Sequence, residues 1–226
     1  MTRGAGREIE PMTLARRAHG VEVVRLGQQS GVQDQIAAAY GGIGYVEIAP
    51  YPLWTRTPVE VSCSTREALS ERLALIYLGA AHASSDVHES VIRSLQDGPG
   101  EATGAAKAAL QRLRDAARAG RDALSAGDLD AYGRALIANT EAQALLHPAL
   151  VSEAAREAFS LAAQHGAAGW KVNGAGGDGG SVTVLAPARV SDRQAFMHAV
   201  ATQLRGATAI PLTLAEGGVA TSAVEL

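Results

Sequence analysis

The chain has 226 residues, of which 47% are apolar and 19% are charged, and its net charge is −3. This composition is typical of a globular protein with a packed core, and the small negative charge gives no reason to expect binding to nucleic acid or to a membrane. The single cysteine, Cys63, excludes an internal disulfide and fits a reducing cytoplasm. No unbroken apolar stretch is long enough to span a bilayer, and the first residues lack the apolar core of a signal peptide.

A helix is predicted from Pro11 to Gly27, because proline is tolerated in a first turn and glycine ends a helix. The following stretch, Gly27 to Gly44, reads GQQSGVQDQIAAAYGGIG. It begins as a loop rich in glycine and glutamine, and it becomes a short helix, Gln33–Tyr40, that a glycine pair ends. The alternating residues after it predict a strand, Ile43–Ile48.

Asp34 lies in the first turn of this short helix, between Gln33 and Gln35. Backbone N–H groups at a helix start keep a carboxylate ionised and fix its direction, which a proton-accepting base requires. From the residues alone, an acid that only stabilises its own helix is the more common explanation. Both interpretations stay open at this point.

The next pattern predicts a strand Pro58–Ser62, a helix Arg66–Glu71 capped by Thr65, and a buried strand Leu73–Leu78. We place a boundary between two domains near Ser62–Thr65. Residues 1–62 and 63–226 are then separate domains.

Helices dominate the middle of the chain. Apolar spacing and capping residues predict four of them: Asp86–Leu95, Glu101–Ser125, a helix capped by Asp128 that runs to Leu146, and a helix capped by Ser152 that runs to Gln164. Asn139, Glu141 and Gln143 on the third helix could face a polar substrate, although exposed helix surface is the more common explanation.

A glycine-rich loop, Gly174–Gly180, follows a short strand, Lys171–Asn173, and precedes another, Ser181–Ala186. Five of its seven residues are glycine, which is more than a tight hairpin needs. Because residues without side chains let the backbone approach a ligand, such loops cradle phosphate. Asp178 would repel a phosphate unless a cation or Lys171 compensates for its charge.

The last part of the chain predicts a helix, Asp192–Arg205, capped by Ser191, and then two strands. Ala209–Leu214 contains Pro211 and is therefore expected at a sheet edge. Val219–Val224 is the final strand.

Two of these stretches resemble motifs of one enzyme family. Gly27–Gly44 resembles the segment G-x-x-x-G-x-Q-D-Q-x-A-A-A-x-G-G of sugar kinases in the GHMP superfamily, which includes galactokinase, homoserine kinase and mevalonate kinase. Gly169–Ser181, which reads GWKVNGAGGDGGS, resembles that superfamily's C-terminal glycine motif, G-x-K-x-x-G-A-G-G-G-G. Two specific motifs in the right order are a stronger signal than one glycine loop. The resemblance is closest to D-glycero-D-manno-heptose 7-phosphate kinases and runs from about Leu14 to the C-terminus.

The resemblance implies an α+β fold, with residues 1–62 as the remainder of the family's N-terminal domain and residues 63–226 as its ferredoxin-like C-terminal domain with added helices. It implies transfer of the γ-phosphoryl group of ATP, with Mg²⁺, to a hydroxyl of a sugar or sugar phosphate. It also implies that Asp34 accepts the hydroxyl proton and that Glu22 helps hold magnesium. From the residues alone, Glu22 could equally be a solvated acid paired with Arg25 or Arg16.

The same resemblance implies the binding residues. Those for the substrate are Gln33, Gln35, His82 and Ser84, and those for the nucleotide are Gly174, Ala175, Gly176, Gly177 and Gly179. His82 stands where many relatives have arginine, in T-G-x-x-R-x-S, and a neutral imidazole is a weaker partner for phosphate than a guanidinium. The alternative for this stretch is a plain turn into a helix, with Ser84 or Ser85 as N-cap.

One family motif is missing. GHMP kinases carry a phosphate loop, P-x-x-x-G-L-G-S-S, and no such stretch occurs in this sequence. Two interpretations stay open: a C-terminal portion of a sugar kinase, or a non-catalytic remnant or partner subunit that keeps the fold of the sugar domain. Without the upstream strands, the chain is expected to expose an apolar edge and to self-associate or pair with a complementing N-terminal chain.

Overall fold

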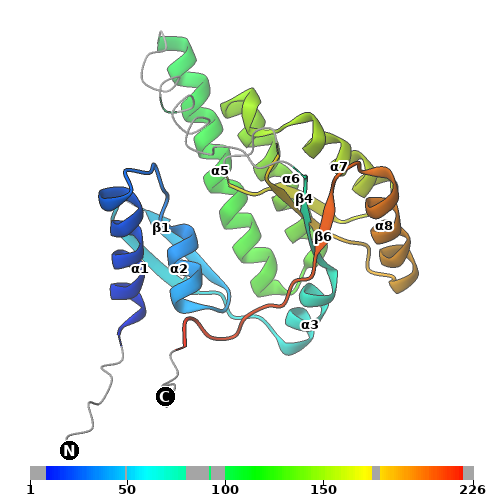
Figure 1. Cartoon of the computed structure of the whole chain (residues 1–226), viewed down its shortest axis with the longest axis horizontal. Helices are drawn as coiled ribbons and strands as arrows, with labels where there is room; N and C mark the ends of the chain where they lie inside the picture. Colours follow the sequence, from blue (N-terminus) through cyan, green and yellow to red (C-terminus); the bar gives the residue numbers. More distant parts are fainter. Residues whose placement is uncertain (1–8, 49, 80–91, 93–99, 175–178, 221–226) are drawn as a thin grey trace, which may run out of the picture. The chain divides into compact units, whose positions relative to one another are not determined.

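The computed structural model of the chain describes residues 9–48, 50–79, 92, 100–174 and 179–220. The chain divides into two compact units (Figure 1). The first unit comprises Met1–Pro58 together with Leu214–Leu226, and the second comprises Val59–Thr213. The sequence placed the boundary at Ser62–Thr65 and the C-terminal residues in the second domain, whereas in the structure these residues group with the first unit.

The first unit pairs two helices with a small sheet. Its helices are α1, Pro11–Gly20, which continues as a π-helical turn, η1, Val21–Arg25, and α2, Gln33–Tyr40. Its strands β1, Gly44–Ile48, and β2, Trp54–Pro58, are antiparallel. The core is made by five buried side chains: Ala15, Val32, Ile36, Ala39 and Trp54. The bounds of α2 confirm the predicted helix.

The predicted strand Pro58–Ser62 is wrong, as is the predicted cap Thr65. Strand β2 ends at Pro58, and the extended residue Ser62 begins α3, Cys63–Arg72. The Ser62 hydroxyl accepts a hydrogen bond from the backbone N–H of Thr65 at 3.1 Å. Since this is the contact that an N-cap side chain makes, the helix begins three residues earlier than the pattern suggested.

The second unit contains a four-stranded antiparallel sheet in the order β4-β5-β3-β6. Its strands are β3, Leu73–Tyr77, β4, Gly169–Val172, β5, Ser181–Leu185, and β6, Thr208–Ile210. Alternate residues, such as Ile76, Val182 and Val184, are fully buried, as expected for one sheet face against a core. Strand β6 lies at the edge, which confirms the prediction made from Pro211, although the strand stops before that residue.

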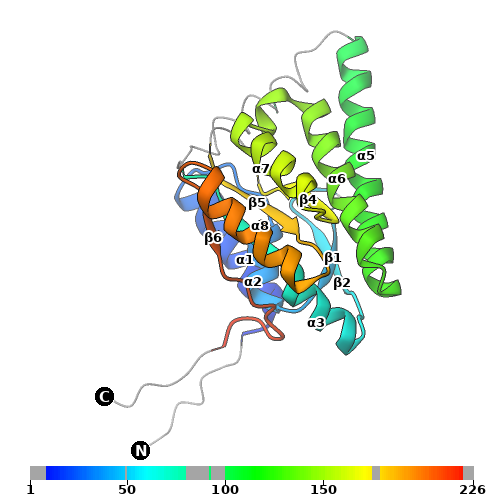
Figure 2. The same ribbon diagram turned by 90° about the vertical axis from the view of Figure 1, so that its right-hand side faces the viewer.

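Helices of the second unit pack against this sheet and against one another. They are α5, Gly100–Ala126, α6, Leu129–Leu146, a short 3₁₀ turn η2, Pro148–Leu150, α7, Glu153–Gln164, and α8, Val190–Gln203. Helices α5 and α6 run side by side (Figures 1 and 2). Helices α7 and α8 contribute Phe159 and Phe196 to the core of this unit. The predicted caps Asp128 and Ser152 are confirmed, since each accepts from a backbone N–H of its helix.

The start of α8 differs from the prediction. Ser191 does not cap this helix, which begins at Val190 after Arg189 and has no side-chain cap. The Ser191 hydroxyl donates to the neighbouring Asp192 carboxylate instead. The predicted helix Asp86–Leu95 and strand Val219–Val224 lie largely outside the described residues. Among the helices that are described, none has the length and apolarity needed to cross a membrane.

Candidate functional site

Asp34 and Gln33 are exposed in the first turn of α2. Among the described residues, no side chain forms a hydrogen bond or ion pair with the Asp34 carboxylate. Helix α2 has no side-chain cap, so its first N–H groups remain to favour a negative charge near Asp34. This carboxylate is therefore open to a substrate that approaches the start of α2.

Glu22 is held by side chains from the motif that follows it. Its Oε2 atom accepts from the Ser30 hydroxyl at 2.5 Å and from Gln35 Nε2 at 2.6 Å. The hydroxyl of Tyr51 donates to the Ser30 carbonyl and lies 2.9 Å from Nε2 of His19. The suggested ion pair of Glu22 with Arg25 or Arg16 is not observed.

These contacts keep Glu22 ionised. The hydrogen bond from Ser30, with a second from Gln35, lowers the pKa of Glu22 from its ordinary value, and the nearby His19 adds a smaller effect in the same direction. Both hydrogen bonds end on Oε2. The other carboxylate oxygen is left for a further partner.

Gln35 is the buried member of this network, with 8% of its surface exposed. Its amide nitrogen donates to Glu22 and, at 3.2 Å, to the hydroxyl oxygen of Ser30. This fixes the orientation of the amide, because a carboxylate can only accept. The amide oxygen, Oε1, is buried, and none of the described residues donates to it. Such an acceptor suits a ligand hydroxyl.

The C-terminal segment closes the far end of α2, a contact that the sequence did not reveal. The N–H of Gly42 donates to Ala215, and that of Val219 donates to Ala38. A Cβ atom on Gly218 would lie 1.9 Å from the carbonyl oxygen of Ala39. The glycine pair Gly217–Gly218 was the available signal, because a close backbone approach requires residues without side chains.

The glycine motif belongs to the second unit. Gly174, Gly179 and Gly180 have positive φ angles, which glycine adopts without strain. A Cβ atom on Gly174 would meet nothing within 4 Å, so its backbone is open on that side. The Lys171 ammonium donates to the carbonyl of Val172 at 2.7 Å. The other predicted residues, Ala175, Gly176 and Gly177, and the substrate residues His82 and Ser84, lie outside the described residues.

A side chain of α6 reaches this motif. Gln143 Nε2 donates to the carbonyl of Gly174 at 3.3 Å, while its Oε1 atom is buried and accepts from no residue in the described part of the chain. The amide oxygen of Asn139, one helical turn earlier, is in the same situation. Both residues lie on one face of α6, whereas Glu141 is exposed, as the sequence suggested. The four-residue spacing of the two amides was the signal that could have singled them out.

The residues present allow a limited role for magnesium. Among the described residues, no three side chains of His, Cys, Asp or Glu type gather as a metal site. Mg²⁺, however, commonly uses one or two carboxylates and completes its shell with water and substrate phosphates. The ionised Glu22, with one oxygen free of hydrogen bonds, fits that role.

Comparison with protein-family models gives no match, and comparison with curated proteins gives none either. Solved structures do match. A D-glycero-D-manno-heptose 1-phosphate kinase from Bacteriodes thetaiotaomicron is 20% identical with a TM-score of 0.63, and the match covers 93% of this chain and 54% of the kinase. The L. major mevalonate kinase bound to R-mevalonate is 19% identical, with a TM-score of 0.68, over 88% of this chain and 56% of the kinase.

The galactokinase of Lactococcus lactis, complexed with galactose, is 17% identical with a TM-score of 0.59, over 93% of this chain and 60% of that protein. These structural neighbours are GHMP-family kinases, and they confirm the α+β fold expected from the sequence. The chain spans just over half the length of each of these kinases.

Proposed function

We propose that this chain forms part of an ATP-dependent kinase of the GHMP type, which transfers the γ-phosphoryl group to a hydroxyl of a sugar or a heptose phosphate. The observation that carries the proposal is the start of α2, where an exposed Asp34 is adjacent to Gln35, the residue that holds Glu22. The fold shared with the kinases above supports it. A cytoplasmic location is part of the same proposal.

In this function, Asp34 accepts the proton of the attacking hydroxyl, which is the role of a general base. Gln33 and Gln35 bind the substrate, and the buried Oε1 atom of Gln35 accepts from one of its hydroxyls. Glu22 would hold Mg²⁺, and the glycine motif, through Gly174, Ala175, Gly176, Gly177 and Gly179, would bind the phosphates of the nucleotide. Bound Mg-ATP supplies the phosphoryl group and the positive charge that offsets it.

A calorimetric titration of the chain with Mg-ATP tests this proposal. Saturable binding that weakens in a Glu22→Gln variant is expected, because that substitution removes the carboxylate but keeps the shape of the side chain. Phosphoryl transfer to a panel of sugars and sugar phosphates is then measured. If Mg-ATP does not bind, this chain is not a kinase by itself.

A second candidate function is a non-catalytic or partner subunit that keeps the substrate-binding fold. Exposed apolar residues of the first unit, such as Val24 at 81% and Leu26 at 61%, suit self-association or a complementing N-terminal chain. Sedimentation that shows a monomer at all concentrations would argue against self-association.

A further inference from the structure

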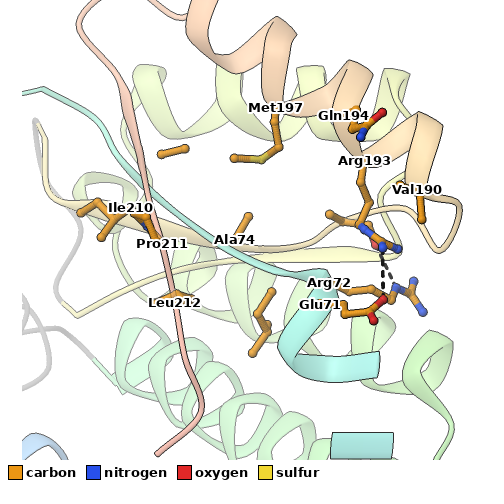
Figure 3. Close-up of a pocket in the computed structure, with 13 residues that line it drawn as sticks. Glu71, Arg72, Ala74, Val190, Arg193, Gln194, Met197, Ile210, Pro211 and Leu212 are labelled. Atoms are coloured by element: carbon orange, nitrogen blue, oxygen red, sulfur yellow. Dashed lines mark hydrogen bonds and ion pairs between the residues drawn. The ribbon is translucent and has the colours of Figure 1, made fainter. Parts of the chain in front are cut away.

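The second unit contains a cavity of about 440 Å³ that residues of neither motif line (Figure 3). It lies between α8, β6 with the residues after it, and the junction of α3 with β3. This volume is within the range of pockets that hold small molecules. Every residue that lines it belongs to the second unit, so the cavity is complete within one compact part of the chain.

One end of the cavity is aliphatic. Figure 3 shows Met197, Ala74, Ile210 and Leu212 around this end. Ile210 is 42% exposed and Leu212 is 38% exposed, so large apolar side chains here face water as well as protein. Hydrocarbon that covers them removes apolar surface from water, which favours binding.

The other end of the cavity is charged. Arg193 and Arg72 both line it, with only 15% and 11% of their side chains exposed. One carboxylate, that of Glu71, also lines it and lies 3.1 Å from Arg193. Two guanidinium groups and one carboxylate line this wall, and Arg72 has a further acidic partner outside the cavity, Asp130.

These two arginines do not use all of their N–H donors. Arg193 donates to Glu71 and to the carbonyls of Pro187 and Ala188, and Arg72 Nε donates to the carbonyl of Ala186. Asp130, which does not line the cavity, forms an ion pair with Arg72 at 3.7 Å, a distance too long for a hydrogen bond. Because a guanidinium carries five N–H donors, both can still bind an anion.

We propose that this cavity binds a small amphipathic carboxylate, with its hydrocarbon part against Met197, Ile210 and Leu212 and its carboxylate at Arg193 and Arg72. The occupant follows from the cavity itself, because an apolar wall excludes a wholly polar ligand and the unused N–H donors of two guanidinium groups favour an anion. This site is separate from the proposed kinase residues and does not depend on them.

The test uses decanoate as the probe, at concentrations below its micellar threshold, and the full chain labelled at its methionine methyl groups. The methyl resonance of Met197 is expected to shift saturably with decanoate. The resonance of Met12, which lies in the first unit, is the internal control and is expected to stay in place. Shifts of both signals, or of neither, would overturn the proposal.

Two comparisons test the charged end. Decanol has the same chain without the charge, and we expect it to bind at least about tenfold more weakly. Arg193→Gln is expected to weaken decanoate binding by a similar factor, whereas Arg189→Gln, at an exposed arginine that does not line the cavity, leaves it unchanged. Equal binding of decanol and decanoate would overturn the assignment of an anion.

A filled cavity provides the last comparison. Met197→Trp places a larger side chain in the aliphatic end and is expected to abolish binding, while thermal unfolding shows whether the variant remains folded. If that variant fails to fold, the shift of the Met197 resonance in the unaltered chain still shows whether decanoate binds in the cavity. A Met197 signal that moves with protein concentration alone would assign the cavity to a second copy of the chain and reject the carboxylate.

Discussion

The two motifs that the sequence singled out are ordered by different means. In the first unit, side chains hold one another: Ser30 and Gln35 both donate to Glu22. In the second unit, close backbone contact fixes the position of α6 against β4. Gly133 of α6 and Gly169 of β4 approach so tightly that neither position has room for a Cβ atom. That approach brings α6 to β4, and further along the helix Gln143 meets the glycine motif.

The two regions nevertheless end in a similar arrangement. Gln35 and Gln143 each donate from the amide nitrogen to another residue, and each has a buried amide oxygen to which no residue that the structure describes donates. An unpaired buried acceptor costs about 1–3 kcal/mol. We infer that both oxygens are acceptors for ligand hydroxyls or for ordered water, and that stability is lost here in favour of binding.

The largest expected effect is on the chemistry of the first region. Asp34→Asn keeps the size of the side chain but removes the basic oxygen, and it is expected to lower any phosphoryl transfer by about 10²–10⁴-fold. Glu153→Gln is the matched control, because Glu153 is also an exposed acid in a first helical turn, that of α7. Turnover and thermal unfolding are measured for both variants.

The control separates the two explanations of Asp34. If this residue only stabilises its helix, both variants lose a little stability and neither loses activity. Near-normal turnover in Asp34→Asn would remove Asp34 from the mechanism.

The next effect tests the backbone contact of the second region. In Gly133→Ala, the new Cβ atom would lie 2.2 Å from the carbonyl oxygen of Ala168, so the helix must move from the strand. We expect the free energy of unfolding to fall by about 2–3 kcal/mol, as measured by denaturant titration. Gly120→Ala on α5 is the control, because its Cβ would be 3.6 Å from Tyr132, an ordinary contact.

Gly120 lies within a helix, where alanine is favoured over glycine by up to about 1 kcal/mol, so the control is expected to be neutral or stabilising. Equal losses of unfolding free energy in the two variants would mean that replacing any helical glycine has this cost, whatever its neighbours. The backbone contact would then not explain how the second region is ordered.

The sequence predicted local structure well where the signal was local. The helix Gln33–Tyr40 and the caps Asp128 and Ser152 depend on residues within one turn of each other, and all three are confirmed. The network at Glu22 could not be predicted, because it depends on where a loop places Ser30. The grouping of Leu214–Leu226 with the first unit joins residues far apart in the chain, and no local pattern encodes that contact.

The starts of two helices provide a smaller comparison, because a side chain caps one of them and not the other. Ser62 caps α3, whereas α8 begins without a side-chain cap even though Ser191 lies in its first turn. Ser62→Ala is expected to lower the free energy of unfolding by about 1 kcal/mol, and Ser191→Ala is expected to leave it nearly unchanged. Equal losses in chemical denaturation would show that Ser191 contributes to its helix by a contact other than capping.

The smallest effect concerns the charge of Glu22 and depends on pH. Its pKa is lowered in the folded chain, chiefly by the hydrogen bond from Ser30, so the folded state binds the proton less tightly than the unfolded state does. The stabilisation from this group is therefore complete above its ordinary pKa of 4.5 and is lost as the pH falls through the lower folded value. Glu22→Gln removes this dependence, so the unfolding midpoints of the variant and the unaltered chain converge as the solution is acidified.

Glu47→Gln is the control for that experiment, since Glu47 is an exposed glutamate of β1 in the same unit. We expect it to follow the unaltered chain at every pH. Ser30→Ala removes the donor while keeping the carboxylate, so it reproduces part of the Glu22→Gln profile if the hydrogen bond is the cause. If Ser30→Ala instead behaves like Glu47→Gln, side chains do not order the first region as the structure indicates, and the contrast with the backbone-ordered second region fails.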